Sequence, residues 1–380
     1  MNLSLIIFMA IVLLLPSCQQ SQSAGSKQAY LVSENLGVKQ FIWHDHNRLD
    51  EIYGGDRIIN AQVWYPANDI SSERTPYYYK IDSVWKNLNH WSEEDFESVS
   101  KVMTKSYLNS PISSGSSTYP LIIFSPSLGG NLSQYTYYAE QLASRGFIVL
   151  GLNHLYESEY VLDKSSLIFT ANHAFHDSLK TLEIPKQITA EAYRKAKGQR
   201  HKVLGLDIIF SLNQLLKEPF FKTRIDLSKI GAFGHSIGGA SVIYASMLDD
   251  RIKAVIDLDG TPPTFAFDQG LSVPFLFIED LTDFQNHPGY AKLHQRRNNF
   301  CQFNKSDSWR ILIAEANHNS FLDTHYFLEN DIEAKRKALK FHQLTANFMS
   351  SFFDSHLNDR PILLEAIDSD TLKVLCFIKD

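Results

Sequence analysis

The 380-residue sequence predicts an α/β fold in which a mostly parallel central sheet carries helices on both faces. The first reason is that short, continuous apolar segments recur along the chain and alternate with segments of helical spacing. Continuous apolar runs are typical of parallel strands, which are buried on both faces. The second reason is a glycine-rich turn that joins one such strand to a helix of small residues. The expected strands are residues 57–66, 119–124, 147–150, 229–233, 253–256, 273–278 and 309–314, and the expected helices include residues 203–216, 241–248 and 341–353.

The glycine-rich turn holds the pattern Gly-x-Ser-x-Gly, filled by Gly234, Ser236 and Gly238. A strand that turns sharply into a helix forces its central residue into a strained backbone conformation, and glycines on both sides remove side chains that would clash. We therefore predict that Ser236 is held clear of the sheet, at the N-terminus of the next helix, as a nucleophile. The alternative interpretation is an ordinary glycine-rich connection between a strand and a helix.

Two segments depart from the alternation of strands and helices. Residues 71–118 are polar and aromatic, include Tyr77-Tyr78-Tyr79 and end in a Ser/Gly-rich stretch. This composition favours an insertion or a cap that faces the substrate, although the tyrosines fit plain packing residues equally well. Residues 155–190 lack clear periodicity, and we expect this second insertion to form loops above the sheet.

Charge and cysteine usage exclude several kinds of partner. The formal net charge is −6 and no long basic run occurs, so nucleic acid is not an expected partner. The three cysteines lack metal-ligand spacing, although Cys301 and Cys376 could form a disulfide in an oxidising compartment. Two histidine pairs have no convincing third ligand nearby, namely His44 with His46 and His173 with His176. The sequence therefore predicts no metal site and no cofactor.

The N-terminus has the features of a bacterial lipoprotein signal. Residues 3–15 are almost entirely apolar, too short to span a bilayer comfortably, and typical of a signal-peptide h-region. The following Leu-Pro-Ser-Cys resembles the bacterial lipobox, in which the cysteine, here Cys18, is lipidated. We expect a signal peptide over residues 1–18, a polar tether over 19–35 and one domain over 36–380. The expected location is the bacterial cell envelope, on the periplasmic or surface side, with a lipid anchor in the membrane. A simple cleaved signal or a buried N-terminal strand is the alternative.

A serine hydroxyl is a poor nucleophile at neutral pH, so it needs a base within hydrogen-bond reach and a third group that orients this base. His318 follows the strand 309–314 on a loop, downstream of the serine turn, where such a base is expected. Asp257 and Asp259 end the strand after the turn, and alternation places both on one face. The position of Asp259 at the strand tip, next to a glycine, favours it as the orienting acid. Other acidic residues follow the next strand, namely Glu279, Asp280 and Asp283.

An ester hydrolysed by a serine also requires two backbone N–H groups that stabilise the oxyanion. Ile237, directly after Ser236, can supply one of them. The second should come from the loop after an earlier strand, where Gly129 and Gly130 allow close approach. Leu128 is the candidate on this loop.

In several blocks the chain resembles the plasma-type platelet-activating-factor acetylhydrolase family of α/β-hydrolases. The blocks are Tyr119–Gly130, Ala143–Val149, Gly234–Ala240, Leu258-Asp259 and His318. The resemblance as a whole covers about residues 57–318. The resemblance implies the α/β-hydrolase fold, with Ser236 as nucleophile, Asp259 as acid and His318 as base. It also implies Leu128 and Ile237 as oxyanion donors, and hydrolysis of short or oxidised acyl chains of phospholipids without metal or calcium. Pro126 and Ser127 stand where the family commonly has His-Gly.

Two other functions fit the same sequence. One is a dienelactone- or polyester-type hydrolase on the same fold, which differs in its substrate. The other is a non-catalytic surface lipoprotein that keeps the fold as a binding module. The serine, acid and histidine argue against the binding module, because a module that only binds has no need of all three.

Overall fold

The computed structural model describes residues 33, 35–50, 52, 54–68, 73–88, 91–171, 190–281, 290–361, 369 and 371–379. The expected signal peptide, Cys18 and nearly all of the expected tether lie outside these residues, as do His173 and His176. None of the described helices is both long and apolar enough to cross a membrane.

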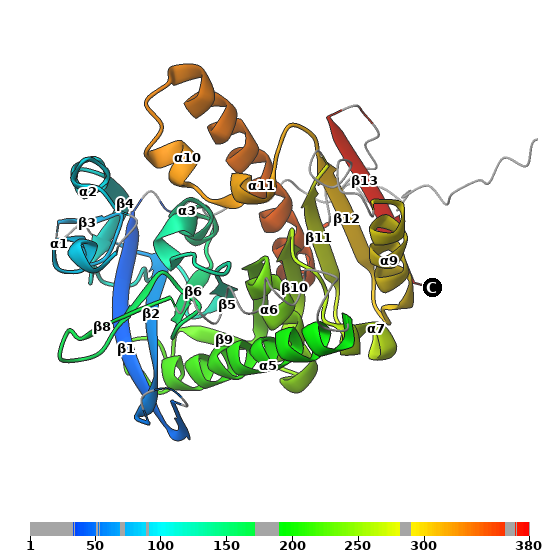
Figure 1. Cartoon of the computed structure of the whole chain (residues 1–380), viewed down its shortest axis with the longest axis horizontal. Helices are drawn as coiled ribbons and strands as arrows, with labels where there is room; N and C mark the ends of the chain where they lie inside the picture. Colours follow the sequence, from blue (N-terminus) through cyan, green and yellow to red (C-terminus); the bar gives the residue numbers. More distant parts are fainter. Residues whose placement is uncertain are drawn as a thin grey trace, which may run out of the picture.

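An eleven-stranded sheet forms the centre of the described chain, in the order β13-β12-β11-β10-β9-β5-β6-β2-β1-β4-β3 (Figure 1). From β12 through β6 all neighbouring strands run parallel, whereas β13 and β2 join the two ends of this block in the antiparallel sense. The prediction of a mostly parallel sheet is therefore confirmed. The strands are β1 (Leu36–Leu49), β2 (Asp56–Pro66), β3 (Arg74–Pro76), β4 (Met103–Leu108), β5 (Tyr119–Ser125), β6 (Ile148–His154), β9 (Ile225–His235), β10 (Ile252–Leu258), β11 (Phe275–Asp280), β12 (Ser308–Ile313) and β13 (Leu372–Phe377), with β7 (Tyr160–Leu162) and β8 (Ile168–Thr170) in a separate two-stranded sheet.

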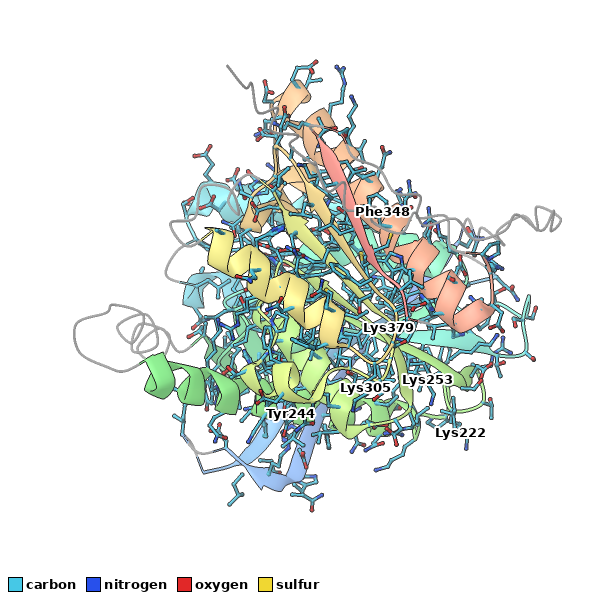
Figure 2. All side chains as sticks on the ribbon, turned by 90° about the vertical axis from the view of Figure 1, so that its right-hand side faces the viewer. Lys222, Tyr244, Lys253, Lys305, Phe348 and Lys379 are labelled. Carbon is cyan, nitrogen blue, oxygen red and sulfur yellow. The ribbon has the colours of Figure 1, made fainter. Side chains whose placement is uncertain are left out.

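Helices cover both faces of the sheet, as predicted. Ile122 and Phe124 of β5 belong to a buried cluster with α3 and α11, whereas Leu121 and Ile123 point to the other face and belong to a cluster with α5, α6, α7 and α9. Figure 2 looks onto the β13 edge and shows α9 and α11 on opposite sides of it. The helices are α1 (Ile81–Val84), α2 (Glu93–Ser100), α3 (Thr136–Ser144), α5 (Ala190–Leu215), α6 (Ile237–Leu248), α7 (Thr264–Gln269), α9 (Tyr290–Phe303), α10 (Thr324–Phe327) and α11 (Ile332–Asn358), with the 3₁₀ turns η1 (Trp85–Asn87), η2 (Leu132–Tyr135) and η3 (His318–Phe321).

The first insertion, residues 71–118, adds an edge to the sheet. Its strand β4 pairs with β1, and β3 pairs with β4. Tyr77 and Tyr78 are buried in a small apolar cluster that includes α1 and residues from β7. Of the two interpretations of the tyrosines, packing is the one that the structure shows.

The second insertion corrects one expectation. Residues 155–190 were expected to form loops only, but β7 and β8 pair as an antiparallel hairpin within them. The reason is a side chain of the main sheet: Asn60 of β2 accepts a hydrogen bond from the Leu162 amide and donates one to its carbonyl, both at 2.7 Å. The periodicity of residues 155–190 does not indicate this contact, because Asn60 is far from Leu162 in the sequence. Residues 172–189 of the insertion lie outside the described part of the chain.

The two cysteines of the domain are both thiols, so the disulfide left open by the sequence is not formed. Cys301 is buried in α9, and burial raises the pKa of its thiol well above the ordinary value. Cys376 lies in β13, opposite Trp309 of β12.

Candidate active site

Ser236 occupies a sharp turn between β9 and α6. Its backbone has φ 58° and ψ −118°, a conformation that residues with a side chain rarely adopt. The tight turn requires glycine at the flanking positions: a Cβ on Gly234 would overlap the backbone of Gly238, and a Cβ on Gly238 would lie 2.5 Å from the Pro126 carbonyl oxygen. The strand, turn and helix thus have the arrangement that the sequence predicts for a nucleophilic serine.

The structure brings His318 and Asp259 together. Nδ1 of His318 lies 2.6 Å from Oδ2 of Asp259. His318 is the first residue of η3, and Asn317 caps this turn by accepting a hydrogen bond from the Asn319 amide at 3.0 Å. The His318 side chain is 42% exposed, whereas that of Asp259 is 7% exposed. The pair therefore has a buried acid and an imidazole that solvent can reach, and the ring nitrogen that contacts Asp259 is Nδ1 rather than Nε2.

Asp257, the alternative acid, has a different environment. Its Oδ1 accepts a hydrogen bond of 2.8 Å from the Gly260 amide, and its carboxyl group packs so closely on Gly239 that no Cβ fits there. Burial raises the pKa of Asp257 well above its ordinary value. Asp259 differs because its backbone turns to a φ of 49° directly after β10, which aims its carboxylate at His318.

A buried ion-pair cluster lies behind Asp259. Arg297 of α9 is 4.0 Å from Asp259 Oδ1 and donates a 3.0 Å hydrogen bond to the Gly260 carbonyl. Glu279 of β11 lies between Arg297 and Arg310, whose Nε is 2.7 Å from its carboxylate. Burial alone would raise the pKa of Glu279, but the guanidinium groups of Arg297 and Arg310 hold this pKa below its ordinary value. Glu279 is therefore the counter-ion of the two arginines, whereas Asp259 is the carboxylate that contacts His318.

His235, the residue before Ser236, forms one wall of the site. Its ring centroid is 4.6 Å from that of His318, and its Nδ1 lies 2.8 Å from the Tyr135 hydroxyl. Burial, together with the charge of His318, lowers the pKa of His235 well below its ordinary value. The ring is thus held neutral against the candidate base. No sequence signal marks it beyond its place inside the Gly-x-Ser-x-Gly pattern.

In the candidate oxyanion loop, residues 125–130, three amides donate hydrogen bonds to other groups of the protein. The Ser127 amide donates to the Tyr135 hydroxyl at 3.1 Å, the Gly129 amide to the Glu157 carbonyl at 2.6 Å and the Gly130 amide to the Ser127 carbonyl at 3.0 Å. Within the described part of the chain, the Leu128 amide has no such acceptor. The Ile237 amide is the first of α6, and the first amides of a helix have no partner within it. The two amides that the sequence predicts as oxyanion donors, those of Leu128 and Ile237, thus have no acceptor in the described part of the chain that would prevent this role.

Elsewhere the described residues offer no metal centre, since no group of three or more His, Cys, Asp or Glu side chains comes together in the part of the chain that the structure covers. His46 instead pairs with Asp56 on the surface, at 2.6 Å.

The fold and the serine turn define an α/β-hydrolase. The solved structure of a ferulic acid esterase from Streptomyces cinnamoneus matches this fold, with a TM-score of 0.72 over 90% of this chain and 96% of the other, at 23% identity. Residues 55–202 and 194–347 match the family described as platelet-activating factor acetylhydrolase, isoform II, and the chain belongs to this family.

Two curated relatives show how far the similarity reaches. The platelet-activating factor acetylhydrolase of Canis lupus familiaris is 29% identical over 243 residues, which cover 58% of this chain and 52% of the dog protein. A protein of Arthroderma benhamiae named "Probable 1-alkyl-2-acetylglycerophosphocholine esterase" is 27% identical over 143 residues, 37% of this chain and 31% of the fungal protein. The chain thus spans about half the length, or less, of these relatives.

Proposed function

We propose that this protein is a serine carboxylic-ester hydrolase, in which Ser236 is the nucleophile, His318 the general base and Asp259 the group that orients the base. The observation that carries the proposal is the 2.6 Å contact between His318 Nδ1 and Asp259, beside the ring of His235, which directly precedes a serine at φ 58°. The family membership supports it, because members of this family are named as esterases of acetylated lipids.

The geometry supports the following sequence of steps. Nε2 of His318 takes the proton of Ser236 as its oxygen attacks the ester carbonyl, and Asp259 stabilises the imidazolium through Nδ1. The amides of Leu128 and Ile237 donate hydrogen bonds to the oxyanion, and His318 then returns the proton to the leaving alcohol. Water, activated by the same histidine, releases the acyl group from Ser236.

For the substrate we propose short-chain acyl esters, including the sn-2 acyl group of phospholipids. The support is the names of the relatives: the dog protein is named as an acetylhydrolase of platelet-activating factor, and the fungal protein as an esterase of a 2-acetyl glycerophosphocholine. A dienelactone- or polyester-type activity would instead favour lactones and polyesters over phospholipids, so the same assays on those substrates distinguish the two.

The test is hydrolysis of p-nitrophenyl esters from acetate to octanoate by the full chain and its Ser236→Ala variant. We expect the variant to lose at least ~10⁴-fold in kcat because the nucleophile is removed. Ser246→Ala is the matched control, since Ser246 lies in α6, the helix that follows Ser236, and its hydroxyl donates to the Ile243 carbonyl at 2.9 Å. Full activity in Ser236→Ala, or none in a folded wild-type chain on any ester or phospholipid, would contradict the proposal.

We also propose the lipid anchor at Cys18, which lies outside the described residues and is supported by the sequence pattern alone. A Cys18→Ala variant expressed in a bacterium should move from the membrane fraction to the soluble fraction, because the acylated residue is lost. Retention in the membrane fraction would show that the chain is held there in another way.

A further inference from the structure

A second Ser-His-Asp chain of hydrogen bonds lies in the interior, next to the candidate oxyanion loop. Ser125 Oγ, at the end of β5, is 2.9 Å from His154 Nε2, and His154 Nδ1 is 2.8 Å from Asp207 Oδ2 on α5. Arg57 of β2 pairs with both oxygens of Asp207, at 2.7 Å each. Ser125, His154 and Asp207 are completely buried, so no substrate can reach this serine.

The charges in this chain fix its hydrogen atoms. Burial alone would raise the pKa of Asp207, but Arg57 and its hydrogen bonds hold that pKa well below the usual range, so Asp207 is an anion. Burial lowers the pKa of His154 despite the neighbouring carboxylate, so the imidazole is neutral. A neutral imidazole beside an anion donates through Nδ1–H, and Nε2 is then an acceptor for the Ser125 hydroxyl. The negative charge of Asp207 therefore sets the direction of both hydrogen bonds: Ser125 donates to His154, and His154 donates to Asp207.

The position of Ser125 gives this chain a connection to the active site. Ser125 pairs with Gly234 between β5 and β9, and its carbonyl oxygen packs on Gly238, where no Cβ fits. Three residues further on lies Leu128, whose amide is a candidate oxyanion donor. Ser125 therefore stands where the serine turn and the oxyanion loop meet.

The segment after His154 holds the other end of the loop. The carbonyl of Glu157 accepts the Gly129 amide at 2.6 Å, and the Glu159 amide donates to the Gly130 carbonyl at 3.0 Å. The Glu157 carboxylate contacts Arg200 and lies 3.9 Å from Arg57. The same buried charges thus support both ends of the oxyanion loop.

We propose that the chain Ser125–His154–Asp207 positions the Leu128 amide for oxyanion stabilisation, with His154 as the central positioning residue. The inference rests on the proposed ester hydrolysis. Backbone donors act only when they are preorganised at the place where charge develops, and small displacements weaken them in the transition state more than in the substrate complex.

The test compares Ser125→Ala with Ser211→Ala in the full chain, using p-nitrophenyl acetate and a trifluoromethyl ketone that forms a tetrahedral adduct. Ser211 is the matched control, because it is equally buried, lies in α5, and its hydroxyl has no hydrogen-bond partner among the described residues. For Ser125→Ala we expect kcat to fall by roughly 10- to 100-fold, less than the loss of a whole oxyanion donor. The inhibition constant of the ketone should rise in parallel, while KM and the pH profile stay as in the wild type, since the His318–Asp259 pair is not touched.

A second variant covers the case in which Ser125→Ala does not fold. Ser125→Cys keeps a weak donor at the position, so it should show a smaller loss of the same kind, in kcat and in ketone binding. If Ser125→Ala or Ser125→Cys loses thermal stability but keeps the kcat and ketone affinity of Ser211→Ala, the chain is structural only and the inference is wrong. A folded wild-type chain without esterase activity would instead overturn the proposed function, and this inference with it.

Discussion

Asp257 and Asp259 stand two residues apart on the same strand end, yet their carboxyl groups have opposite environments. Asp257 is buried against glycines and its pKa is raised by burial, whereas Asp259 contacts His318 at 2.6 Å and lies 4.0 Å from Arg297. An orienting acid must be an anion when the imidazolium forms. The ionic surroundings therefore favour Asp259 over Asp257.

This contrast predicts different effects of the same substitution. Asp259→Asn should lower kcat by on the order of 10³–10⁴-fold, because an amide can hold His318 in the wrong tautomer and does not stabilise its cation. Asp257→Asn should leave kcat close to that of the wild type, since a neutral amide replaces a carboxyl group whose pKa favours the neutral form. Steady-state kinetics on p-nitrophenyl acetate measure both. Equal losses in the two variants would reject the assignment of the acid.

The predictability of the site differs from residue to residue. Ser236, His318 and the choice of Asp259 come from patterns along the chain, namely a glycine-flanked turn and strand ends. Tyr135, His235 and Arg297 contact the site through tertiary structure, and no spacing in the sequence marks their contacts. Arg310 is different, because the sequence shows it as a charged residue within an apolar strand. A charge buried in such a strand requires a partner of opposite charge. Glu279 is that partner.

Three elements meet at Asp323, just after η3, and fix the segment that carries His318. Asp323 Oδ2 accepts the Tyr137 amide of α3 at 2.7 Å, and its own amide donates to the Gln134 carbonyl at 2.8 Å. Its Oδ1 accepts a hydrogen bond from Tyr77 of the first insertion. The insertion is thus tied to the loop of the candidate base, which is a structural role in addition to any contact with substrate.

The buried carboxyl group of Asp323 predicts a pH dependence of stability. Burial raises its pKa from 3.8 to about 8, so the folded chain binds this proton more tightly than the unfolded chain does. The resulting stabilisation is complete below pH ~4, declines as the pH rises, and is lost above pH ~8. In Asp323→Asn this contribution is absent. We expect the unfolding midpoint of the wild type to fall more steeply between pH 6 and 8 than that of the variant, as measured by differential scanning calorimetry. Parallel curves would contradict this account.

At the scale of the whole molecule, the sequence predicts the centre of the sheet better than its edges. The strands β5, β6, β9, β10, β11 and β12 are short apolar runs because helices cover both of their faces, and this is the pattern that a sequence displays most clearly. The strands β1, β4 and β13, at or near the two edges, mix polar and apolar residues, and β4 and β13 pair with strands that are far from them in the sequence. The helices α5 and α11 extend beyond the predicted segments, because their outer turns are polar and lack the apolar spacing.

The central claim, that Ser236 is a nucleophile activated by His318, is tested most directly by labelling the full chain with a fluorophosphonate and locating the adduct by peptide mass spectrometry. We expect one adduct, on Ser236, and almost none in a folded His318→Ala variant, because the hydroxyl then has no base. An adduct on another serine, or labelling of Ser236 at the same rate without His318, would contradict the account.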